Sequence, residues 1–251
     1  MRVGVIGAAG RMGREVAHAV VTDPDLELVA LVDPSHAGLT IEGVVVASSL
    51  EALIEADTDV AVEFTRPEAA PANITWCIEH ALHVVTGTTG FDPDPSWDAQ
   101  KAVGVLIAPN FAIGAVLMQR FAEQAVRYLP DTEIIELHHH DKPDAPSGTA
   151  MATARRMAAA RGGVPAEPRE ERVPGARGAD VDGIRVHSVR LPGLVAHQEV
   201  ILGAQGQTLR IRHDATDWTS FMPGVLMAVK AVAIRPGLTV GLDVLLGHEQ
   251  G

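Results

Sequence analysis

The chain has 251 residues, of which 47% are hydrophobic, so it can bury one large core or two modest ones. Its formal net charge of −12 argues against nucleic acid or a membrane surface as a partner, because both attract basic patches. No stretch reaches the apolar length of a transmembrane helix, no signal peptide precedes the first predicted strand, and the single cysteine, Cys77, excludes an internal disulfide. These features predict a cytoplasmic protein.

The N-terminal segment predicts a dinucleotide-binding turn. A short apolar strand is predicted for residues 2–7 and a helix for residues 11–21, with a glycine-rich turn between them. Such a turn lets the backbone approach a pyrophosphate, which the helix N-terminus then holds. The G-x-x-G-x-x-G spacing differs from the more common G-x-G-x-x-G, and a plain strand-turn-helix without a ligand is the alternative. The candidate cofactor-binding residues are Gly7, Ala8, Ala9, Gly10, Arg11 and Met12.

An acidic residue follows the second predicted strand, residues 26–32. Asp33 comes twenty residues after Gly13, a distance that suits hydrogen bonds to the adenosine ribose hydroxyls. Its carboxylate favours NADH and repels the 2′-phosphate of NADPH, and residues 34–37 contain no Arg or Lys. When it is protonated, His36 is a partial substitute for such a cation beside the 2′-phosphate. We expect use of both NADH and NADPH, with NADH equal or better.

Strands and helices continue to alternate up to residue 111. Strands are predicted at residues 59–65, 82–86 and 103–107, a helix at 67–80 and a helical stretch near 95–101. Ligands of open parallel sheets bind beyond the carboxyl ends of the strands, where two turns of this segment lie. Those turns contain Gly87, Thr88, Thr89, Ala108, Pro109, Asn110 and Phe111.

The hydrophobic pattern changes after Phe111 and predicts a second domain. Its elements are helices at 113–129 and 148–161, strands at 132–140, 184–190, 194–202 and 208–213, and a loop at 162–183. A helix at 219–234 follows this domain. The three consecutive alternating strands, together with strand 132–140, predict a mixed or antiparallel sheet. Loops as long as 162–183 tend to be functional or mobile.

Three consecutive histidines stand at the end of strand 132–140. Side chains on a strand alternate between faces, so His138 and His140 are predicted on one side and His139 on the other. A zinc site needs three or four ligands that converge, whereas these histidines diverge and Cys77 is distant, so we expect no metal ion. Lys142 precedes Pro143, which keeps the lysine extended and near the face that carries His138.

The turn after the histidines ends in a predicted anion site. Ser147 is a favourable N-cap, and residues 148–161 are rich in alanine and have high helix propensity. The N–H groups of Gly148 and Thr149 then point outward with the positive end of the helix dipole, which suits a carboxylate. Histidines and a lysine beside such a helix start predict an enzyme with an acidic substrate.

The run from Glu136 to Ala150 resembles the signature of the 4-hydroxy-tetrahydrodipicolinate reductase (dihydrodipicolinate reductase) family. That signature, E-x-H-H-x-x-K-x-D-A-P-S-G-T-A, is met at every fixed position. The glycine-rich turn and the turns at 87–89 and 108–111 are also similar to cofactor-contacting turns of this family. Glu63 stands where the family usually has Asp, a departure with little expected effect on cofactor binding.

The resemblance implies an activity and roles for particular residues. The implied reaction is the NAD(P)H-dependent reduction of 4-hydroxy-tetrahydrodipicolinate, via dihydrodipicolinate, to tetrahydrodipicolinate in diaminopimelate and lysine biosynthesis. NADH and NADPH are the implied cofactors, and His138 and Lys142 the implied acid–base catalysts. The implied substrate contacts are His139, Lys142, Ser147, Gly148 and Thr149.

The expected fold is α/β with two domains. Residues 1–112 and 221–251 are expected to form a Rossmann-like parallel-sheet domain that binds the dinucleotide. Residues 113–220 are expected to form an α+β domain with a mixed sheet that binds the substrate and mediates oligomerisation. An open sheet face would leave Val186, Val195 and Ile201 uncovered, which soluble monomers avoid over large areas. Together with the resemblance, this predicts a homotetramer.

Two other functions fit parts of the sequence. Another two-domain Rossmann dehydrogenase, acting on a small amino or keto acid, would keep the glycine-rich turn and Asp33 but has no need of the whole run 136–150. A non-enzymatic NAD(P)-sensing module would keep the cofactor turns, but not His138 and Lys142 beside an anion-binding helix start. Oxidation of NADH or NADPH with aspartate semialdehyde, pyruvate and the preceding synthase distinguishes these functions.

Overall fold

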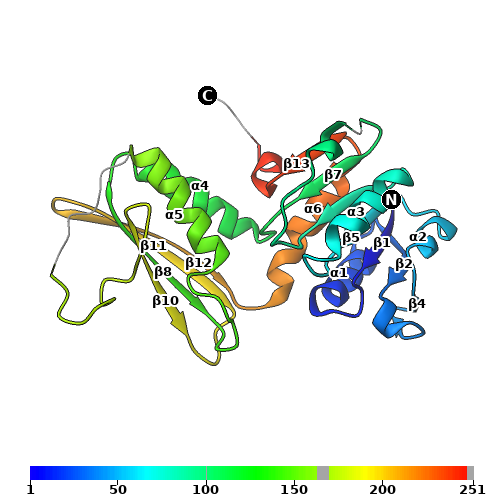
Figure 1. Ribbon diagram of the computed structural model, residues 1–251, viewed down its shortest axis with the longest axis horizontal. Coiled ribbons are helices and arrows are strands. Elements are labelled where there is room, and N and C mark those ends of the chain that lie inside the picture. The colour runs from blue at the N-terminus through cyan, green and yellow to red at the C-terminus, as the bar shows by residue number, and fades with distance from the viewer. Residues whose placement is uncertain (100, 163–169, 248–251) are drawn as a thin grey trace. The chain divides into compact units, whose positions relative to one another are not determined.

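The computed structural model describes residues 1–99, 101–162 and 170–247. The chain forms two compact units: Met1–Ile113 with Phe221–Gly251 make up the first, and Gly114–Ser220 the second. Each unit has its own sheet (Figure 1), which confirms the predicted α/β class with two sheets. Within the described ranges, no helix combines the length and apolar character needed to cross a membrane.

The first unit contains an eight-stranded sheet in the order β13-β7-β6-β5-β1-β2-β4-β3. Its strands are β1 (Arg2–Ile6), β2 (Glu27–Val32), β3 (Thr40–Ile41), β4 (Val44–Ala47), β5 (Val60–Glu63), β6 (His83–Thr86), β7 (Gly104–Ile107) and β13 (Gly237–Val240). Every neighbouring pair is parallel except β3 with β4. Strands β5 and β7 are buried at every residue, as expected for parallel strands covered on both faces. The predicted Rossmann-like sheet is therefore confirmed.

Three of the four described α-helices of the first unit begin and end close to the predicted positions, and the fourth, Glu51–Glu55, is not predicted. The four helices are α1 (Arg11–Thr22), α2 (Glu51–Glu55), α3 (Ala70–Glu79) and α6 (Met222–Val232), with 3₁₀ helices at Pro34–His36, Pro95–Ala99 and Leu242–Leu245. Helices α3 and α6 begin later than predicted, each with a proline in its first turn, where a missing N–H costs no hydrogen bond. A 3₁₀ turn, Trp218–Phe221, precedes α6.

Some short segments differ from the sequence prediction. The helical stretch expected near 95–101 is a 3₁₀ helix that ends at Ala99, and residue 100 lies outside the described residues. Elements β3, β4 and α2 are too short for a hydrophobic period to predict them.

The second unit contains a five-stranded sheet in the order β12-β11-β8-β10-β9. Its strands are β8 (Asp131–His138), β9 (Ala179–Val181), β10 (Ile184–Arg190), β11 (Ala196–Ala204) and β12 (Gln207–Ala215). Strands β8 and β10 are parallel and the other pairs antiparallel, so the predicted mixed sheet is confirmed. Helices α4 (Ile113–Ala125) and α5 (Gly148–Arg161) pack on one face of it (Figure 1). Helix α4 ends at Ala125, before the predicted residue 129.

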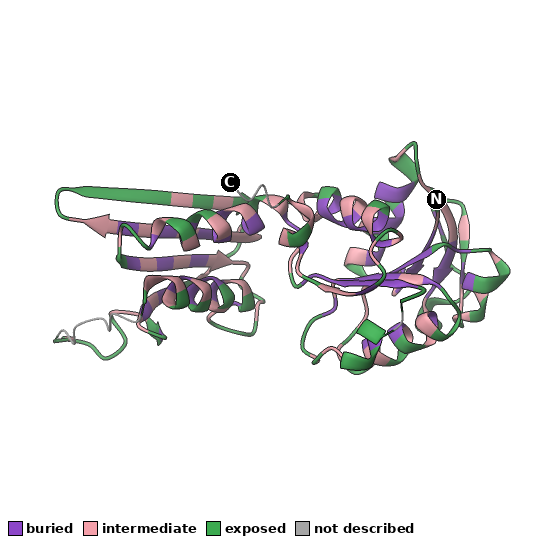
Figure 2. Ribbon diagram, turned by 90° about the horizontal axis from the view of Figure 1, so that it is seen from above, coloured by how far each residue is buried: buried purple, intermediate pink, exposed green. Residues whose placement is uncertain are grey.

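The core of the second unit lies between that sheet face and the two helices. Thr132, Ile134 and Glu136 of β8 are buried, and the alternation of burial along the strands is visible in Figure 2. Val186 pairs with Ile134 across the sheet and therefore shares its face. It is 1% exposed in the core, so the expectation that Val186 lies on the open face is wrong.

Strand β8 ends at His138, two residues earlier than predicted. Both of its neighbours end there as well, because Arg190, the last residue of β10, and Ala196, the first of β11, pair with His138. Beyond the paired residues, one backbone hydrogen bond is made on each side, from His139 N to Val195 O at 3.4 Å and from Leu191 N to His138 O at 3.2 Å. His139 and His140 belong to the following loop, so the strand that was expected to carry all three histidines carries only His138.

The loop predicted at 162–183 contains a strand. Strand β9 pairs with β10 across a turn formed by Asp182 and Gly183, whose φ angles are +52° and +81°. Two positive φ angles in an Asp-Gly pair are typical of a type I′ hairpin turn. Residues 163–169 of the predicted loop lie outside the described residues.

Candidate active site

The glycine-rich turn after β1 depends on residues without a side chain. Gly7 has a φ of +80°, and a Cβ atom on it would lie 2.2 Å from Phe64 O. A Cβ atom on Gly13 would lie 2.2 Å from Gly7 O. The hydrogen-bond ladder of α1 begins with Arg14 N donating to Gly10 O at 3.1 Å. The N–H groups of the first turn precede that ladder and point out of the helix end, where a pyrophosphate fits.

Asp33 follows β2 and contacts this turn directly. Its Oδ2 accepts a hydrogen bond from Ala9 N at 3.3 Å, and its Oδ1 accepts one from Ser35 N at 3.1 Å. The Nδ1 atom of His36 lies 3.1 Å from the same Oδ1. The Asp33 side chain is 14% exposed, so it is held in place while part of the carboxylate faces solvent. These residues fit the ribose of a dinucleotide.

Glu63, the last residue of β5, anchors the turn after β6. It is entirely buried; its Oε2 accepts from Thr86 Oγ1 at 2.6 Å, and its Oε1 accepts from Thr65 N at 3.1 Å. Thr88 joins the same network, because its Oγ1 accepts from Thr65 N at 2.9 Å and its N–H donates to Thr86 Oγ1 at 3.1 Å. The sequence signal for this role is a carboxylate at the end of an apolar strand.

The turn after β7 is fixed by both backbone and side-chain contacts. Ala108 N donates to Thr86 O at 3.0 Å, Asn110 Oδ1 accepts from Ala112 N at 2.8 Å, and the ring of Phe111 lies 5.9 Å from that of Phe64. Strands β1, β6 and β7 are parallel members of one sheet, so their following turns lie along the same carboxyl edge. The structure thus brings the three predicted cofactor turns to one edge.

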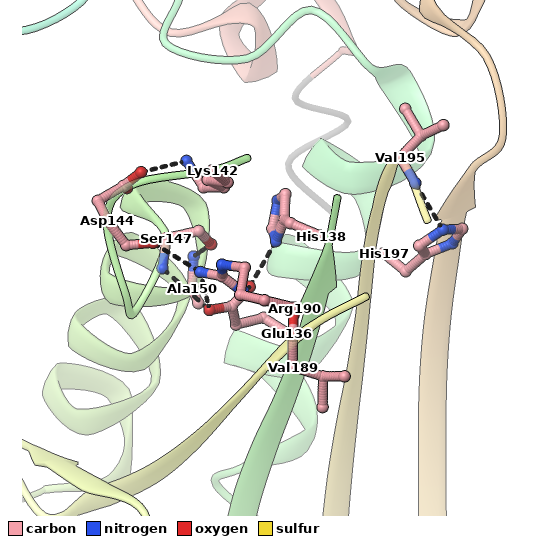
Figure 3. Close-up of polar contacts among 10 residues, drawn as sticks. All are labelled: Glu136, His138, Lys142, Asp144, Ser147, Ala150, Val189, Arg190, Val195 and His197. Atoms are coloured by element: carbon pink, nitrogen blue, oxygen red, sulfur yellow. Dashed lines mark hydrogen bonds and ion pairs between the residues drawn. The ribbon is translucent and has the colours of Figure 1, made fainter. Parts of the chain in front are cut away.

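In the second unit, Glu136 and His138 lie on the same face of β8 (Figure 3). Glu136 is entirely buried, and its Oε2 is hydrogen-bonded to His138 Nδ1. Arg190 donates from Nη1 to Oε2 at 2.9 Å and from Nη2 to Oε1 at 2.8 Å. Burial alone would raise the pKa of Glu136, but hydrogen bonds from His138, Arg190 and Ser188 outweigh it and hold the pKa at about 2. Glu136 is therefore ionised near neutral pH.

The loop between β8 and α5 carries Lys142. Its Nζ donates to Asp144 Oδ1 at 2.7 Å, and this hydrogen bond lowers the pKa of Asp144. Arg190 Nη2 donates to the backbone oxygen of Asp144 at 2.7 Å. The same arginine therefore ties the Lys142 loop to the carboxylate that contacts His138 (Figure 3).

Helix α5 begins at Gly148, as predicted, with Ser147 as its N-cap. Ser147 is buried, its Oγ accepts from Ala150 N at 3.2 Å, and its N–H donates to Glu136 Oε1 at 3.3 Å. Gly148 is exposed, and a Cβ atom on it would meet no heavy atom within 4 Å. The buried hydrogen bonds of Ser147 therefore fix the start of the helix, while Gly148 leaves its outer side accessible.

A buried polar cluster that the sequence did not reveal holds the first turn of α5. Thr153 Oγ1 donates to Thr149 O at 2.8 Å and accepts from Gln198 Nε2 at 2.9 Å and from Gln119 Nε2 at 3.1 Å. Gln119 comes from α4 and Gln198 from β11. Residues so far apart in the chain give no local motif, so only the fold brings them together.

The other two histidines have separate surroundings. The rings of His139 and Trp218 meet edge to face with their centroids 6.5 Å apart. His140 Nε2 lies 3.1 Å from Asp141 Oδ1, and both side chains are exposed. Across the described part of the chain, no group of three or more His, Cys, Asp or Glu residues is arranged to hold a metal ion.

Reduction by a nicotinamide needs a dinucleotide site and a source of protons for the acceptor. The turns of the first unit suit the dinucleotide, while the second unit places a histidine and a lysine near an anion-accepting helix start. The fold and the two groups of residues together define a nicotinamide-dependent oxidoreductase that acts on a small acid.

Comparison with known proteins gives the family. The profile described as dihydrodipicolinate reductase, N-terminus, matches residues 1–111, and the one described as dihydrodipicolinate reductase, C-terminus, matches residues 114–246. The chain belongs to the dihydrodipicolinate reductase family. The implied activity, NAD(P)H-dependent reduction of 4-hydroxy-tetrahydrodipicolinate in the lysine and diaminopimelate pathway, is confirmed, as is the use of NADH or NADPH by the family.

Relatives match over nearly the whole chain. The 4-hydroxy-tetrahydrodipicolinate reductase of Nocardia farcinica (strain IFM 10152) is 53% identical and covers 98% of both chains. That of Mycobacterium marinum (strain ATCC BAA-535 / M) is 50% identical and covers 99% of this chain and 100% of its own. The dipicolinate-bound dihydrodipicolinate reductase from Paenisporosarcina sp. TG-14 has a TM-score of 0.87 at 39% identity, over 97% of this chain and 98% of that one.

More distant structures share the fold alone. A probable dehydrogenase from Thermotoga maritima has a TM-score of 0.62 at 14% identity and covers 98% of this chain and 92% of its own. Such a likeness supports neither the alternative dehydrogenase activity nor a sensing role for this chain.

Proposed function

We propose that His138 and Lys142 perform the proton transfers of this reduction, and that Lys142, Gly148 and Thr149 bind the substrate carboxylates. One observation carries the proposal: the buried carboxylate of Glu136 contacts both His138 Nδ1 and Ser147 N, the cap of α5 (Figure 3). The histidine and the helix start are therefore parts of one cluster. Arg190 joins the Lys142 loop to the same cluster through Asp144.

The proposed proton transfers follow from the hydrogen bond that His138 already makes and from the charge of Lys142. NADH or NADPH, when bound, supplies a hydride to an unsaturated ring carbon of the substrate, and the ring must then gain a proton. His138 uses Nδ1 for Glu136, which leaves Nε2 to exchange a proton. Lys142 supplies a second donor and, as a cation, holds a carboxylate. Positioned proton transfer contributes about a hundredfold to ten-thousandfold to the rate.

The substrate carries two carboxylates, and the second unit offers two places for them. One carboxylate rests on the N–H groups of Gly148 and Thr149, where the dipole of α5 favours negative charge. The other pairs with the ammonium group of Lys142, whose side chain is 22% exposed. Ser147 keeps the helix start in place as its cap, and His139 completes the contacts. The dipicolinate bound to the Paenisporosarcina reductase is such a dicarboxylate, which supports this mode of binding.

The dinucleotide contacts are assigned to the first unit. The pyrophosphate binds the first turn of α1 beside the glycine-rich turn, and Asp33 binds the adenosine ribose. The full set of proposed contacts is Gly7, Ala8, Ala9, Gly10, Arg11, Met12, Asp33, Gly87, Thr88, Thr89, Ala108, Pro109, Asn110 and Phe111.

Kinetics of single variants test these assignments. His138→Gln and Lys142→Ala are expected to lower kcat by about a hundredfold or more, because each removes a proton-transfer group. The dissociation constant of NADH, measured by fluorescence titration, should stay within about twofold, since neither residue is assigned to the cofactor. Turnover is followed as loss of NADH absorbance with aspartate semialdehyde, pyruvate and the preceding synthase.

His140→Gln is the matched control. His140 is adjacent in sequence, but it is exposed and paired with Asp141, so this variant should keep its turnover. Full turnover of His138→Gln, or loss of NADH binding in either test variant, contradicts the assignment.

We further infer a cytoplasmic homotetramer that binds neither nucleic acid nor a membrane surface. The net charge of −12 supports the absence of such partners. The partly exposed apolar residues on the sheet face opposite α4 and α5 support self-association.

A further inference from the structure

We propose that Glu136 is a positioning residue that keeps the proton of His138 on Nδ1 and, through Arg190, holds the loop of Lys142. This inference rests on the roles proposed above for His138 and Lys142. Glu136 itself is entirely buried and is not assigned to the substrate or the cofactor. It acts on the reaction only through the residues that it orients.

The first support is the geometry around the Glu136 carboxylate. Glu136 precedes His138 by two residues on β8, so both side chains lie on the face that α5 covers. Oε2 meets His138 Nδ1 and Arg190 Nη1, while Oε1 accepts from Arg190 Nη2 and from Ser147 N. Besides the side-chain hydrogen bond from Ser188, four hydrogen bonds from these three residues therefore converge on one carboxylate (Figure 3).

The second support is the chemistry of an ionised carboxylate. Such a group only accepts hydrogen bonds, so the imidazole nitrogen that faces it must carry a proton. With Nδ1 protonated, the neutral ring of His138 has a bare Nε2 and the charged ring has an Nε2–H. Proton exchange then takes place at Nε2 in both directions. A carboxylate that selects the tautomer of a catalytic histidine has the same effect in hydrolase triads.

The third support is the route from Glu136 to Lys142. Arg190 uses both terminal nitrogens on Glu136, and Nη2 also donates to Asp144 O at 2.7 Å. Asp144 in turn accepts from Lys142 Nζ at 2.7 Å. Within the described residues, Arg190 Nε has no hydrogen-bond partner, so the terminal nitrogens alone hold the guanidinium. Without Glu136, Arg190 loses the carboxylate that holds it to the sheet, and the Lys142 loop loses this connection.

The chain offers a matched control for a purely structural ion pair. Glu133 lies on the same strand but at an odd-numbered position, and it also pairs with one histidine and one arginine. His187 Nε2 lies 2.8 Å from Glu133 Oε2, and Arg177 contacts Oε1. Glu133→Gln removes a carboxylate with the same kinds of partner at a place where no acid–base residue is proposed.

The direct test is the tautomer of His138, measured by ¹⁵N NMR of the protein labelled at histidine. The wild-type protein is expected to carry the proton on Nδ1 whenever the ring is neutral. In Glu136→Gln, donors from Arg190 and Ser147 compete for one amide oxygen, so the amide NH₂ faces His138 and the ring proton moves to Nε2. Glu133→Gln should leave the signal of His138 unchanged. A wild-type His138 with a bare Nδ1 overturns the proposal.

Kinetics provide the second readout. Glu136→Gln should lower kcat by about a hundredfold, with the NADH dissociation constant unchanged, while Glu133→Gln stays within about twofold of wild type. Equal losses in the two variants, or full turnover of Glu136→Gln, overturn the proposal. Should Glu136→Gln not fold, the wild-type NMR spectrum alone decides. That spectrum does not depend on turnover. If the His138 and Lys142 variants keep full activity, the proposed roles of these residues fail, whereas a bare Nδ1 in the wild-type spectrum refutes this inference about Glu136.

Discussion

Single buried carboxylates organise both groups of candidate residues. An ionised group inside a protein needs hydrogen bonds and opposite charge to offset the loss of water. Glu136 meets this need with His138, Arg190 and the N–H of Ser147. The buried carboxyl group of Glu63 is hydrogen-bonded to Thr65 and Thr86. Each carboxylate therefore orders the polar groups around it, which is the state that an active site requires.

The charge of Glu136 makes the stability of the protein depend on pH. Its pKa is about 2 in the folded protein, below the usual value of 4.5, so the unfolded chain binds the proton more tightly. The resulting stability is fully present above about pH 4.5 and is lost as the pH falls toward 2, by up to about 3 kcal/mol. Urea unfolding at about pH 6 and about pH 3 measures this loss. Glu136→Gln should lose less than wild type, and equal losses contradict the prediction.

Asp33 sets the expected cofactor preference. Its carboxylate accepts ribose hydroxyls and repels a 2′-phosphate, whereas His36, 54% exposed beside it, attracts the phosphate only when protonated. We expect kcat/KM for NADH to equal or exceed that for NADPH. The NADPH value should fall as ionic strength rises, because its extra charge is held electrostatically. Assays with both cofactors at two salt concentrations check this, and a strong NADPH preference that is insensitive to salt contradicts it.

The sequence predicts residues that lie together in the chain better than residues brought together by the fold. His138, Lys142 and Ser147 fall within one run, so a local pattern is enough to find them as candidates. Arg190 contacts Glu136 across a separation of 54 residues, and no local sequence pattern predicts that contact. The polar cluster around Thr153 has the same long-range origin.

At the scale of elements, local signals predict helix ends more accurately than strand ends. Helix α5 spans Gly148–Arg161 as predicted, because the Ser147 cap and the left-handed Gly162 are encoded next to it. Strand β8 stops at His138 since its neighbours stop there, which depends on residues far away in the chain. The hydrophobic pattern does not predict strand β9, although the Asp-Gly turn after it is a local signal.

The cap of α5 should contribute to stability more than to catalysis. Ser147→Ala removes the acceptor for Ala150 N and should lower the free energy of unfolding by about 1 kcal/mol. Its loss of kcat should be smaller than that of His138→Gln, because the backbone N–H that meets Glu136 is retained. Urea unfolding and turnover measure the two effects. The exposed Ser96, replaced by alanine, serves as control and should change stability by less than about 0.5 kcal/mol.

At the scale of the whole molecule, the second sheet has one face covered by helices and one without them. The strand register places Ile135, Leu137, Val189 and Ile201 on the uncovered face, all partly exposed. Charged residues alternate with these apolar residues on the same face: Glu199 pairs with Ile135, and Glu133 with Ile201. A face that mixes apolar and charged side chains is compatible with a protein–protein interface.

The expected partner is another copy of the chain. Light scattering at micromolar concentration should give four times the chain mass of 26.5 kDa. Ile201→Glu should give smaller species, because it removes an apolar contact and places a second carboxylate opposite Glu133 on this face. Val45→Glu, at a residue of the first unit that is 61% exposed, should leave the mass unchanged. A wild-type monomer contradicts the prediction.

The central claim is that the second unit binds a dicarboxylate between Lys142 and the start of α5, with His138 facing its ring. A crystal structure with NADH and dipicolinate bound together tests this most directly. We predict one carboxylate on the N–H groups of Gly148 and Thr149, the other on Lys142 Nζ, and His138 Nε2 directed at the ring. A dicarboxylate bound away from Lys142 and the start of α5, with His138 out of reach, would contradict the account.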